Sequence, residues 1–380
     1  MCQLTNETLE YLTNTTEETI GLIETLCKIP SPSNHEKEKA IFIKKWLEDK
    51  GAKNVYIDEV NNVLYPINCQ NSDKVVVFMA HIDTVFPDLT PLPFTKDEKY
   101  LYSPGVGDDT TCVAMLLMVA SLIIKKNLLA KTGVLFAFNS CEEGLGNLKG
   151  IKNIMKHYQN KITQVISFDS QYDCVINDCV GSERYEVIVK TKGGHSFRDF
   201  GNDNAIAIAS KLINKLYDVE VPKKENSKTT YNVGIIKGGT SINTIAQETS
   251  FLYEYRSNSQ ECLKKMKENF LEIVKNFKEK DVEISFNVLG IRPCKENVDE
   301  EKLEKLTQKV INICEKHSNI KCYSYAGSTD CNIPMSMGIP SVAAGCYIGY
   351  GEHTREEKVL IESIPIGLKI VAELVLEYFD

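Results

Sequence analysis

The chain has 380 residues, which is too long for one ordinary core and suits two or three domains at roughly 150 residues each. Its apolar share of 43% and charged share of 25% are those of a globular protein, and its net charge of −8 disfavours a nucleic-acid partner, because such partners need basic surface. No stretch approaches the roughly 18 consecutive apolar residues of a membrane helix, so we expect no membrane partner.

The N-terminal half predicts an alternation of helices and strands. Residues 1–65 are predicted as helix, helix, strand, with the first helix broken at Pro30 and Pro32 and the second ended at Gly51. Short β-branched runs then alternate with helical segments, which is typical of a largely parallel sheet covered by helices on both faces. The predicted strands are 74–81, 132–140 and 162–170, and the predicted helices between them are 110–126 and 147–158.

The pattern changes at about Gly181 and changes back after Arg292. Between these points the sequence predicts four strands and two helices, which is an antiparallel α+β insert. The α/β pattern then returns with a helix at 300–317, an apolar run at 339–349 and a closing helix at 363–379. We therefore predict one α/β domain of residues 1–180 and 293–380 with a mixed, mostly parallel sheet, interrupted by a smaller domain of residues 181–292.

The N-terminus and the cysteines bear on the cellular compartment. The first residues are polar and acidic and lack the basic start and apolar run of a secretory signal. The 13 cysteines are odd in number and without paired spacing, which fits the reducing cytosol better than a disulfide framework. We expect a cytoplasmic protein in which most cysteines are small buried apolar residues.

Residue types that bind metal ions recur at the ends of the predicted strands. In an open α/β sheet the site lies outside the carboxyl ends of the strands. Two imidazoles and several carboxylates at one rim suit a pair of divalent ions, because each ion takes about four N or O ligands and a bridging carboxylate serves both. The residues are His81 and Asp83, Asp108 and Asp109 at a helix start, Glu142 and Glu143, Asp169, and His353 after the run 339–349.

Each of these residues is weak evidence by itself. A single histidine such as His81 is more often an ordinary hydrogen-bonded side chain, and paired aspartates at a helix start are often capping groups. Adjacent glutamates are often a solvated pair. Independent explanations of this kind would not place all of them at strand ends or helix starts, so the pattern indicates a two-metal site.

The motifs resemble those of the M20 family of metallopeptidases and amidohydrolases over essentially the whole chain. The segments HIDTVFP, CEEGLGNLKG and GGTSINTIA look most like the tripeptide aminopeptidase (peptidase T-like) branch. The resemblance implies a zinc-peptidase catalytic domain interrupted by a lid and dimerisation domain, and hence a homodimer. The remaining motifs are Gly107-Asp108-Asp109, Ser167-Phe168-Asp169, Gly193-Gly194-His195-Ser196, Gly327-Ser328-Thr329-Asp330 and Glu352-His353-Thr354.

The resemblance also implies two divalent ions per chain, zinc first, with cobalt or manganese as alternatives. One ion would be held by His81 and Asp169 and the other by Glu143 and His353. Asp108 would bridge both ions.

The neighbours of these ligands have other implied roles. The Asp83 carboxylate would accept the second ring N–H of His81 and so fix its tautomer. Asp109 is left off the metals in the family pattern, and we expect it to cap the helix. Thr110 and Thr111 stand where many members carry Lys-Gly, a departure expected to affect the helix start rather than the metals.

The catalytic and substrate-binding roles follow from the same resemblance. Glu142 would be the general base that takes a proton from a metal-bridged water and returns it to the leaving amine. His195, in the lid, would steady the developing oxyanion, commonly in the partner subunit's site. Asn243 and Arg292 match positions that grip the substrate's carboxylate, although Arg292 could equally be a surface ion-pair residue.

The expected activity is hydrolysis of an amide bond in a di- or tripeptide. An N-acyl-amino-acid deacylase would use the same machinery, and the motifs do not separate the two. A non-catalytic relative that only binds ligands would have eroded metal ligands, and none is eroded here. A purely structural metal site would be closed by Cys and His, whereas a carboxylate-rich site suits catalysis.

Overall fold

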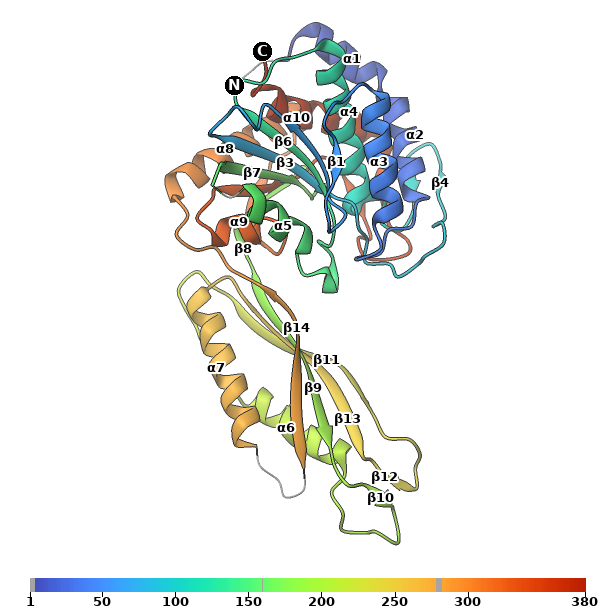
Figure 1. The fold of residues 1–380 in the computed structure, drawn as a ribbon, viewed down its shortest axis with the longest axis vertical. Helices are drawn as coiled ribbons and strands as arrows, with labels where there is room; N and C mark the ends of the chain where they lie inside the picture. The colour runs from blue at the N-terminus through green and yellow to red at the C-terminus, as the bar shows by residue number, and fades with distance from the viewer. Residues whose placement is uncertain (1–3, 159, 278–281) are drawn as a thin grey trace. The chain divides into compact units, whose positions relative to one another are not determined.

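The computed structural model describes residues 4–158, 160–277 and 282–380. The chain divides into two compact units, the first made of Met1–Cys179 with Glu296–Asp380 and the second of Val180–Lys295 (Figure 1). Each unit has a hydrophobic core of its own. All twelve cysteines in the described ranges are free and eleven of them are buried, while Cys2 lies outside those ranges.

An eight-stranded mixed sheet forms the centre of the first unit. Its strands are β1 (Tyr56–Ile57), β2 (Val63–Ile67), β3 (Val75–His81), β6 (Gly133–Asn139), β7 (Ile162–Phe168), β8 (Cys174–Cys179), β15 (Tyr323–Gly327) and β16 (Ser341–Ala344). The strand order is β1-β2-β6-β3-β7-β16-β8-β15. The pairs β3–β6, β3–β7, β7–β16 and β8–β15 are parallel and the other three are antiparallel, which confirms the predicted fold class.

Helices cover both faces of this sheet. They are α1 (Asn6–Asn14), α2 (Thr16–Cys27), α3 (Lys37–Asp49), α4 (Cys112–Lys126), α5 (Lys149–Tyr158), α8 (Glu300–Ser318), α9 (Asn332–Ser336) and α10 (Ile364–Leu376). Successive residues of β3 point to opposite faces, as the two-residue period of a strand requires. Phe78 and Ala80 pack in the core that holds α4 and α10, whereas Val77 and Met79 pack in the core that holds α5.

The prediction of helix, helix, strand for residues 1–65 is wrong in its count. Three helices, α1 to α3, and two strands, β1 and β2, occupy this segment. Helix α1 starts where the Thr5 hydroxyl accepts the N–H of Thr8, and it buries only Thr8 and Leu12. The sequence did not predict this helix, because few of its positions face the core and its apolar residues therefore show no clear helical period.

Helix α4 lies in the middle of the core. The segment Val106–Lys126 is long and apolar enough to cross a membrane by length and composition, but 89% of its most apolar window is buried inside the structure. Burial of this extent is what a central core helix shows, because its whole circumference packs against protein.

A small antiparallel sheet, which the sequence did not predict, lies beside the main one. It consists of β4 (Thr95–Lys96), β5 (Tyr100–Tyr102), β17 (Gly349–Tyr350) and β18 (Lys358–Leu360) in the order β17-β18-β5-β4. Its strands have two or three residues each, too short to show a periodic pattern. The turn between β17 and β18 carries His353.

The second unit is a four-stranded antiparallel sheet with two helices, as predicted. The strands are β9 (Gly181–Lys190), β11 (Thr229–Gly238), β13 (Glu248–Ser257) and β14 (Glu283–Arg292), in the order β11-β13-β9-β14, and the helices are α6 (Ala205–Tyr217) and α7 (Gln260–Asn276). Inward residues of β9 and β13, among them Tyr185 and Phe251, pack with both helices. A short ribbon of β10 (Gly194–His195) and β12 (Thr244–Ile245) was not predicted.

Candidate active site

Three neighbouring parallel strands of the first unit bring site residues to one edge of the sheet. His81 is the last residue of β3, and in the register of β3 with β6 it lies opposite Asn139. Glu142 and Glu143 follow β6, and Asp169 follows β7 directly. Because β6, β3 and β7 are parallel neighbours, these side chains share the carboxyl edge where α/β sheets form their sites.

The two remaining ligand candidates come from other elements. Asp108 lies in the π-helical turn η1 (Val106–Thr111) that leads into α4. His353 lies in the turn between β17 and β18 of the small sheet, after the run 339–349. The main-sheet strand β16 ends at Ala344, and the pairing of β18 with β5 carries the later segment onto the small sheet.

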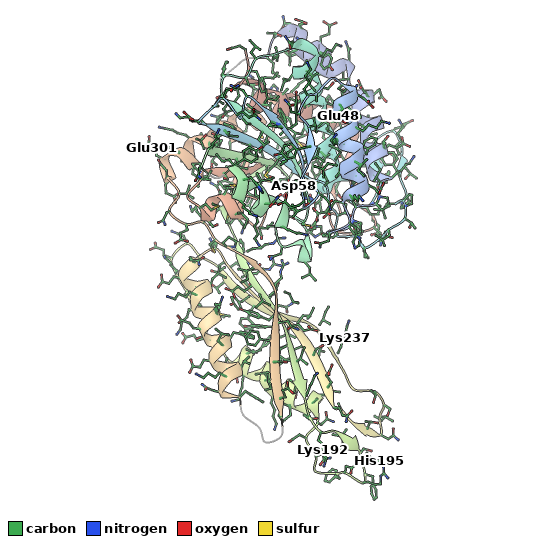
Figure 2. All side chains as sticks on the ribbon, viewed as in Figure 1. Glu48, Asp58, Lys192, His195, Lys237 and Glu301 are labelled. Carbon is green, nitrogen blue, oxygen red and sulfur yellow. The ribbon has the colours of Figure 1, made fainter. Side chains whose placement is uncertain are left out.

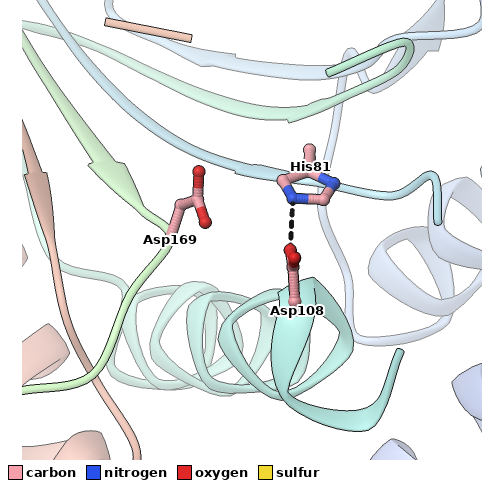
Figure 3. Close-up of side chains that lie close together, drawn as sticks. All are labelled: His81, Asp108 and Asp169. Carbon is pink, nitrogen blue, oxygen red and sulfur yellow. Dashed lines mark hydrogen bonds and ion pairs between the residues drawn. The ribbon is translucent and has the colours of Figure 1, made fainter. Parts of the chain in front are cut away.

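Asp108 faces both histidines through its two carboxylate oxygens. Its Oδ1 is 2.9 Å from His81 Nε2 (Figure 3), and its Oδ2 is 2.9 Å from His353 Nε2. His353 Nε2 is also 3.2 Å from Glu143 Oε1. Asp169 lies on the opposite side of the same space, at the end of β7 (Figure 3). A carboxylate whose two oxygens face two imidazoles is placed where it could serve two ions.

Two overlapping groups of possible metal ligands result. Ligand atoms of His81, Asp108 and Asp169 lie within 4.8 Å of one another, and so do those of Asp108, Glu143 and His353. Asp108 belongs to both groups. A third group, His81 with Glu142 and Glu143, places the Glu142 side chain at the same centre.

The electrostatics of this cluster favour cations. Burial and the nearby Asp108 carboxylate raise the pKa of Glu143 to about 8, and burial likewise raises the pKa of Asp169 to about 8. Hydrogen bonds to Asp108 and Glu143 raise the pKa of His353 to about 11. Glu143 Oε1 is buried, and His353 Nε2 contacts it at 3.2 Å. The donor set and its excess of buried negative charge therefore fit divalent ions.

Asp83 supports the site mainly through backbone contacts. His81 Nδ1 lies 3.1 Å from the Asp83 carbonyl oxygen and 3.5 Å from its Oδ1, so the closer acceptor is the main chain rather than the predicted carboxylate. The carboxylate instead accepts the backbone N–H groups of Glu142 and Glu143, both at 3.0 Å. Ser33 donates its hydroxyl to the same carboxylate at 2.6 Å. Asp83 thereby links the end of β3, which carries His81, to the segment that carries Glu142 and Glu143.

Asp109 does not cap α4, contrary to the prediction. The N-cap of that helix is Thr111, and no side chain caps it. Asp109 is buried, and its Oδ2 accepts the backbone N–H of His81 at 2.9 Å. The chain turns at η1 before the helix begins, and this turn directs the Asp109 side chain inward to the end of β3.

Sequence reasoning missed residues that hold the site loops. Ser33 lies in a segment that was interpreted only as a helix break. Glu36 is buried and accepts the backbone N–H groups of Asn34 at 2.7 Å and Cys141 at 3.2 Å, next to the paired glutamates. Neither residue belongs to a motif, and only the fold brings them to the site.

His195 and Asn243 lie together in the second unit, on the ribbon of β10 and β12. The Ser196 N–H donates to the Asn243 carbonyl oxygen at 3.0 Å, and both predicted residues are exposed (Figure 2 for His195). His195 Nδ1 accepts the backbone N–H groups of Phe197 and Arg198, at 3.2 and 3.4 Å. In the neutral ring Nε2 then carries the proton and is available as a donor.

Arg292 lies at the other end of the same sheet. It is paired with Ser182 near the start of β9, whereas the ribbon follows the Lys190 end of that strand, where Glu248 pairs. The strand between these two points spans roughly 25 Å at about 3.3 Å per residue. Arg292 and Asn243 of one chain therefore cannot hold the same carboxylate. Arg292 is also buried, so it is not a surface ion-pair residue.

Comparisons with known proteins identify the family and the fold. Residues 77–377 match peptidase family M20/M25/M40. The succinyl-diaminopimelate desuccinylase of Corynebacterium glutamicum is 24% identical over 91% of this chain and 92% of its own. A tripeptidase from Staphylococcus aureus has a similar fold, with a TM-score of 0.73 and 22% identity over 95% of this chain and 97% of its own. The Bacillus subtilis YXEP protein, described as a dinuclear metal binding peptidase, has a TM-score of 0.64 and 16% identity over 96% of this chain and 99% of its own.

Proposed function

The chain belongs to peptidase family M20/M25/M40 and is a metallohydrolase of that family, and from this premise we propose that it cleaves an amide bond of a di- or tripeptide. The observation that carries the proposal is the pair of ligand groups that share Asp108. Such a pair suits a dinuclear centre, which is also the description of the similar Bacillus subtilis peptidase.

Two divalent ions, zinc first, are the proposed cofactors. His81 and Asp169 would hold one ion, Glu143 and His353 the other, and Asp108 both. When bound, the ions supply a Lewis acid for the scissile carbonyl and make a nearby water more acidic. Two of these ligands are held through their backbone: the Asp109 carboxylate accepts the N–H of His81, and the Asp83 carboxylate accepts those of Glu142 and Glu143.

Glu142 is the proposed general base. Its side chain belongs to the same centre as His81 and Glu143, and it is buried, which excludes bulk water from the proton transfer. Its carboxylate would take a proton from the attacking water and pass it to the leaving amine. The Asp83 carboxylate fixes the backbone N–H of Glu142 and so orients that side chain toward the centre.

His195 and Asn243 are the residues of the second unit that we propose to take part in the reaction. The Nε2–H of His195 would donate to the developing oxyanion, as its acceptor contacts at Nδ1 allow. Asn243 and Arg292 are proposed to bind the substrate's carboxylate. Since one chain cannot bring both to one carboxylate, this role requires that two chains contribute, and we propose a homodimer with shared active sites.

An N-acyl-amino-acid deacylase remains the second candidate function. The similarity to a curated desuccinylase favours it, whereas the similar tripeptidase fold favours a peptide substrate. Both reactions break an amide bond close to a free carboxylate, so the site geometry serves either.

Metal analysis and a substrate panel test the proposal together. We expect close to two equivalents of zinc, cobalt or manganese per chain after reconstitution, and loss of activity on chelation.

Di- and tripeptides should be hydrolysed faster than N-acetyl and N-succinyl amino acids. Amidation of the substrate's C-terminus should raise KM if Asn243 and Arg292 bind the carboxylate. A reconstituted protein without metal would contradict the two-metal site, and faster N-acyl hydrolysis would favour the deacylase.

A further inference from the structure

A buried glutamate outside every motif contacts the loop that presents Asp108. Glu357 Oε1 accepts the backbone N–H groups of Gly107 at 2.8 Å and of Asp108 itself at 2.9 Å. Its Oε2 accepts the N–H of Gly105 at 2.7 Å. Only 1% of Glu357 is exposed. Three N–H groups directed at one carboxylate form a charge-assisted set that fixes the loop strongly.

The loop is shaped to admit this carboxylate. A Cβ at Gly107 would lie 2.7 Å from the Tyr347 ring and 3.0 Å from Glu357 Oε1, so a larger residue would collide with the ring and crowd the carboxylate. Gly105 has a φ of +73°, a conformation that glycine adopts without strain. The two glycines on either side of Val106 therefore allow the backbone to approach Glu357 closely.

The same residue is joined to the His353 turn. Glu357 comes four residues after His353, immediately before β18, and its carbonyl oxygen accepts the Ser103 N–H at 3.2 Å. The turn is also anchored by Arg355, which lies two residues before Glu357 and bonds Asp88 at 2.6 Å. His353 thus precedes a segment that is fixed at Arg355 and Glu357, although its own side chain is 57% exposed.

We propose that Glu357 is a positioning residue that holds the shared ligand Asp108 in register with His353. One carboxylate connects the segment that carries the bridging ligand to the turn that carries the exposed histidine. This inference rests on the proposed two-metal site and adds a residue that binds neither metal nor substrate. The other links between the Asp108 loop and the β17–β18 turn are the Asp108–His353 contact, the backbone hydrogen bond from Ser103 to Glu357 and the short pairing of β18 with β5. None of these fixes the backbone N–H of Asp108.

Replacement of Glu357 by glutamine is the direct test. An amide has one oxygen and turns an NH₂ group toward a backbone N–H, so at least one of the three hydrogen bonds is lost. Cobalt affinity should fall about 10- to 100-fold, the usual effect of removing a residue that orients a ligand. The visible absorption of bound cobalt should change as well, because the ligand geometry changes.

The melting temperature separates positioning from general stabilisation. A merely structural role would lower the melting temperature of metal-free and cobalt-loaded protein equally. Positioning predicts a smaller gain in melting temperature on cobalt binding, since that gain depends on affinity. Glu356→Gln, which changes the exposed neighbouring glutamate, is the matched control and should retain wild-type cobalt binding.

Glu357→Asp provides the second variant. It keeps the charge but shortens the reach, so it should bind cobalt more tightly than Glu357→Gln and more weakly than wild type. Wild-type cobalt affinity and spectrum in Glu357→Gln would overturn the inference, as would the same result in Glu357→Asp if the glutamine variant fails to fold. A wild-type protein that binds no cobalt would instead overturn the two-metal proposal on which the inference depends.

Discussion

Two adjacent glutamates at the site look alike in sequence and have different surroundings. Glu143 lies 3.2 Å from His353 and belongs to the group that includes Asp108. Glu142 joins only the group with His81 and Glu143. Alternate side chains of an extended segment point in different directions, which would let the chain at 142–143 present Glu143 as the proposed ligand and Glu142 as the proposed base.

Exchanging each carboxylate for an amide should separate the two roles. Glu142→Gln should fold, keep its metals and bind substrate, while kcat falls by a factor on the order of 10² to 10⁴, or about 3 to 5 kcal/mol of barrier. Glu143→Gln should mainly lower metal affinity. Metal titration and steady-state kinetics on both proteins measure this. Near wild-type kcat in Glu142→Gln, or metal loss in that variant alone, would reverse the assignment.

At the scale of elements, the helix that follows Asp108 belongs to a packed group of helices. Helices α8 and α10 both pack in the core that also holds α4, the helix that follows Asp108. A buried carboxylate joins the two helices: Glu373 of α10, 1% exposed, contacts Lys316 at 2.7 Å and His317 at 2.6 Å. Burial lowers the pKa of His317, so its ring is neutral near pH 7 and its Nε2–H donates to the carboxylate.

Glu373→Gln should therefore destabilise the first unit. The amide keeps the shape but weakens two charge-assisted hydrogen bonds in a buried setting, which should lower the free energy of unfolding by about 1 to 3 kcal/mol. Urea denaturation followed by circular dichroism measures the change. Glu301→Gln, at the exposed pair with Lys305, is the control and should change stability by less than about 0.5 kcal/mol. Equal effects of the two substitutions would contradict this account of the α8–α10 contact.

At the scale of the whole molecule, the second unit carries features of an assembly surface. Its edge strand β11 is exposed along most of its length, with Ile235 at 47% and Ile236 at 51% exposure. An exposed apolar edge strand is an open pairing site for another chain. Together with the separation of Asn243 from Arg292 within the unit, this supports the proposed homodimer.

Subunit complementation tests whether active sites are shared. His195→Ala and Glu142→Gln should each be nearly inactive alone. After subunit exchange in an equal mixture, half of the dimers would carry one intact site, so activity should return to about one quarter of wild type. Sedimentation should show a dimer for each variant and for the mixture. A fully active monomer, or no recovery despite demonstrated exchange, would refute shared sites.

The sequence by itself determined the fold class, the four-stranded insert and the identity of the ligand candidates. The apolar run of β3, which is buried throughout, the alternating burial along most of β9, and the alternation of strands with helices are local patterns set by each element's own packing. The residues that follow β3, β6 and β7 could be predicted to lie together, because neighbouring parallel strands end at the same edge of the sheet. These features need no knowledge of distant contacts.

Tertiary structure alone decided how the ligands are held. His353 reaches Asp108 from a separate small sheet whose strands are too short to leave a pattern, and Asp109 turns inward to His81 instead of capping α4. Ser33 and Glu357 reach the site over long stretches of chain, 50 residues from Ser33 to Asp83 and 249 from Glu357 to Asp108. A hydrogen bond between such distant residues has no local signature, because it depends on how the whole chain packs and not on the neighbours of either residue.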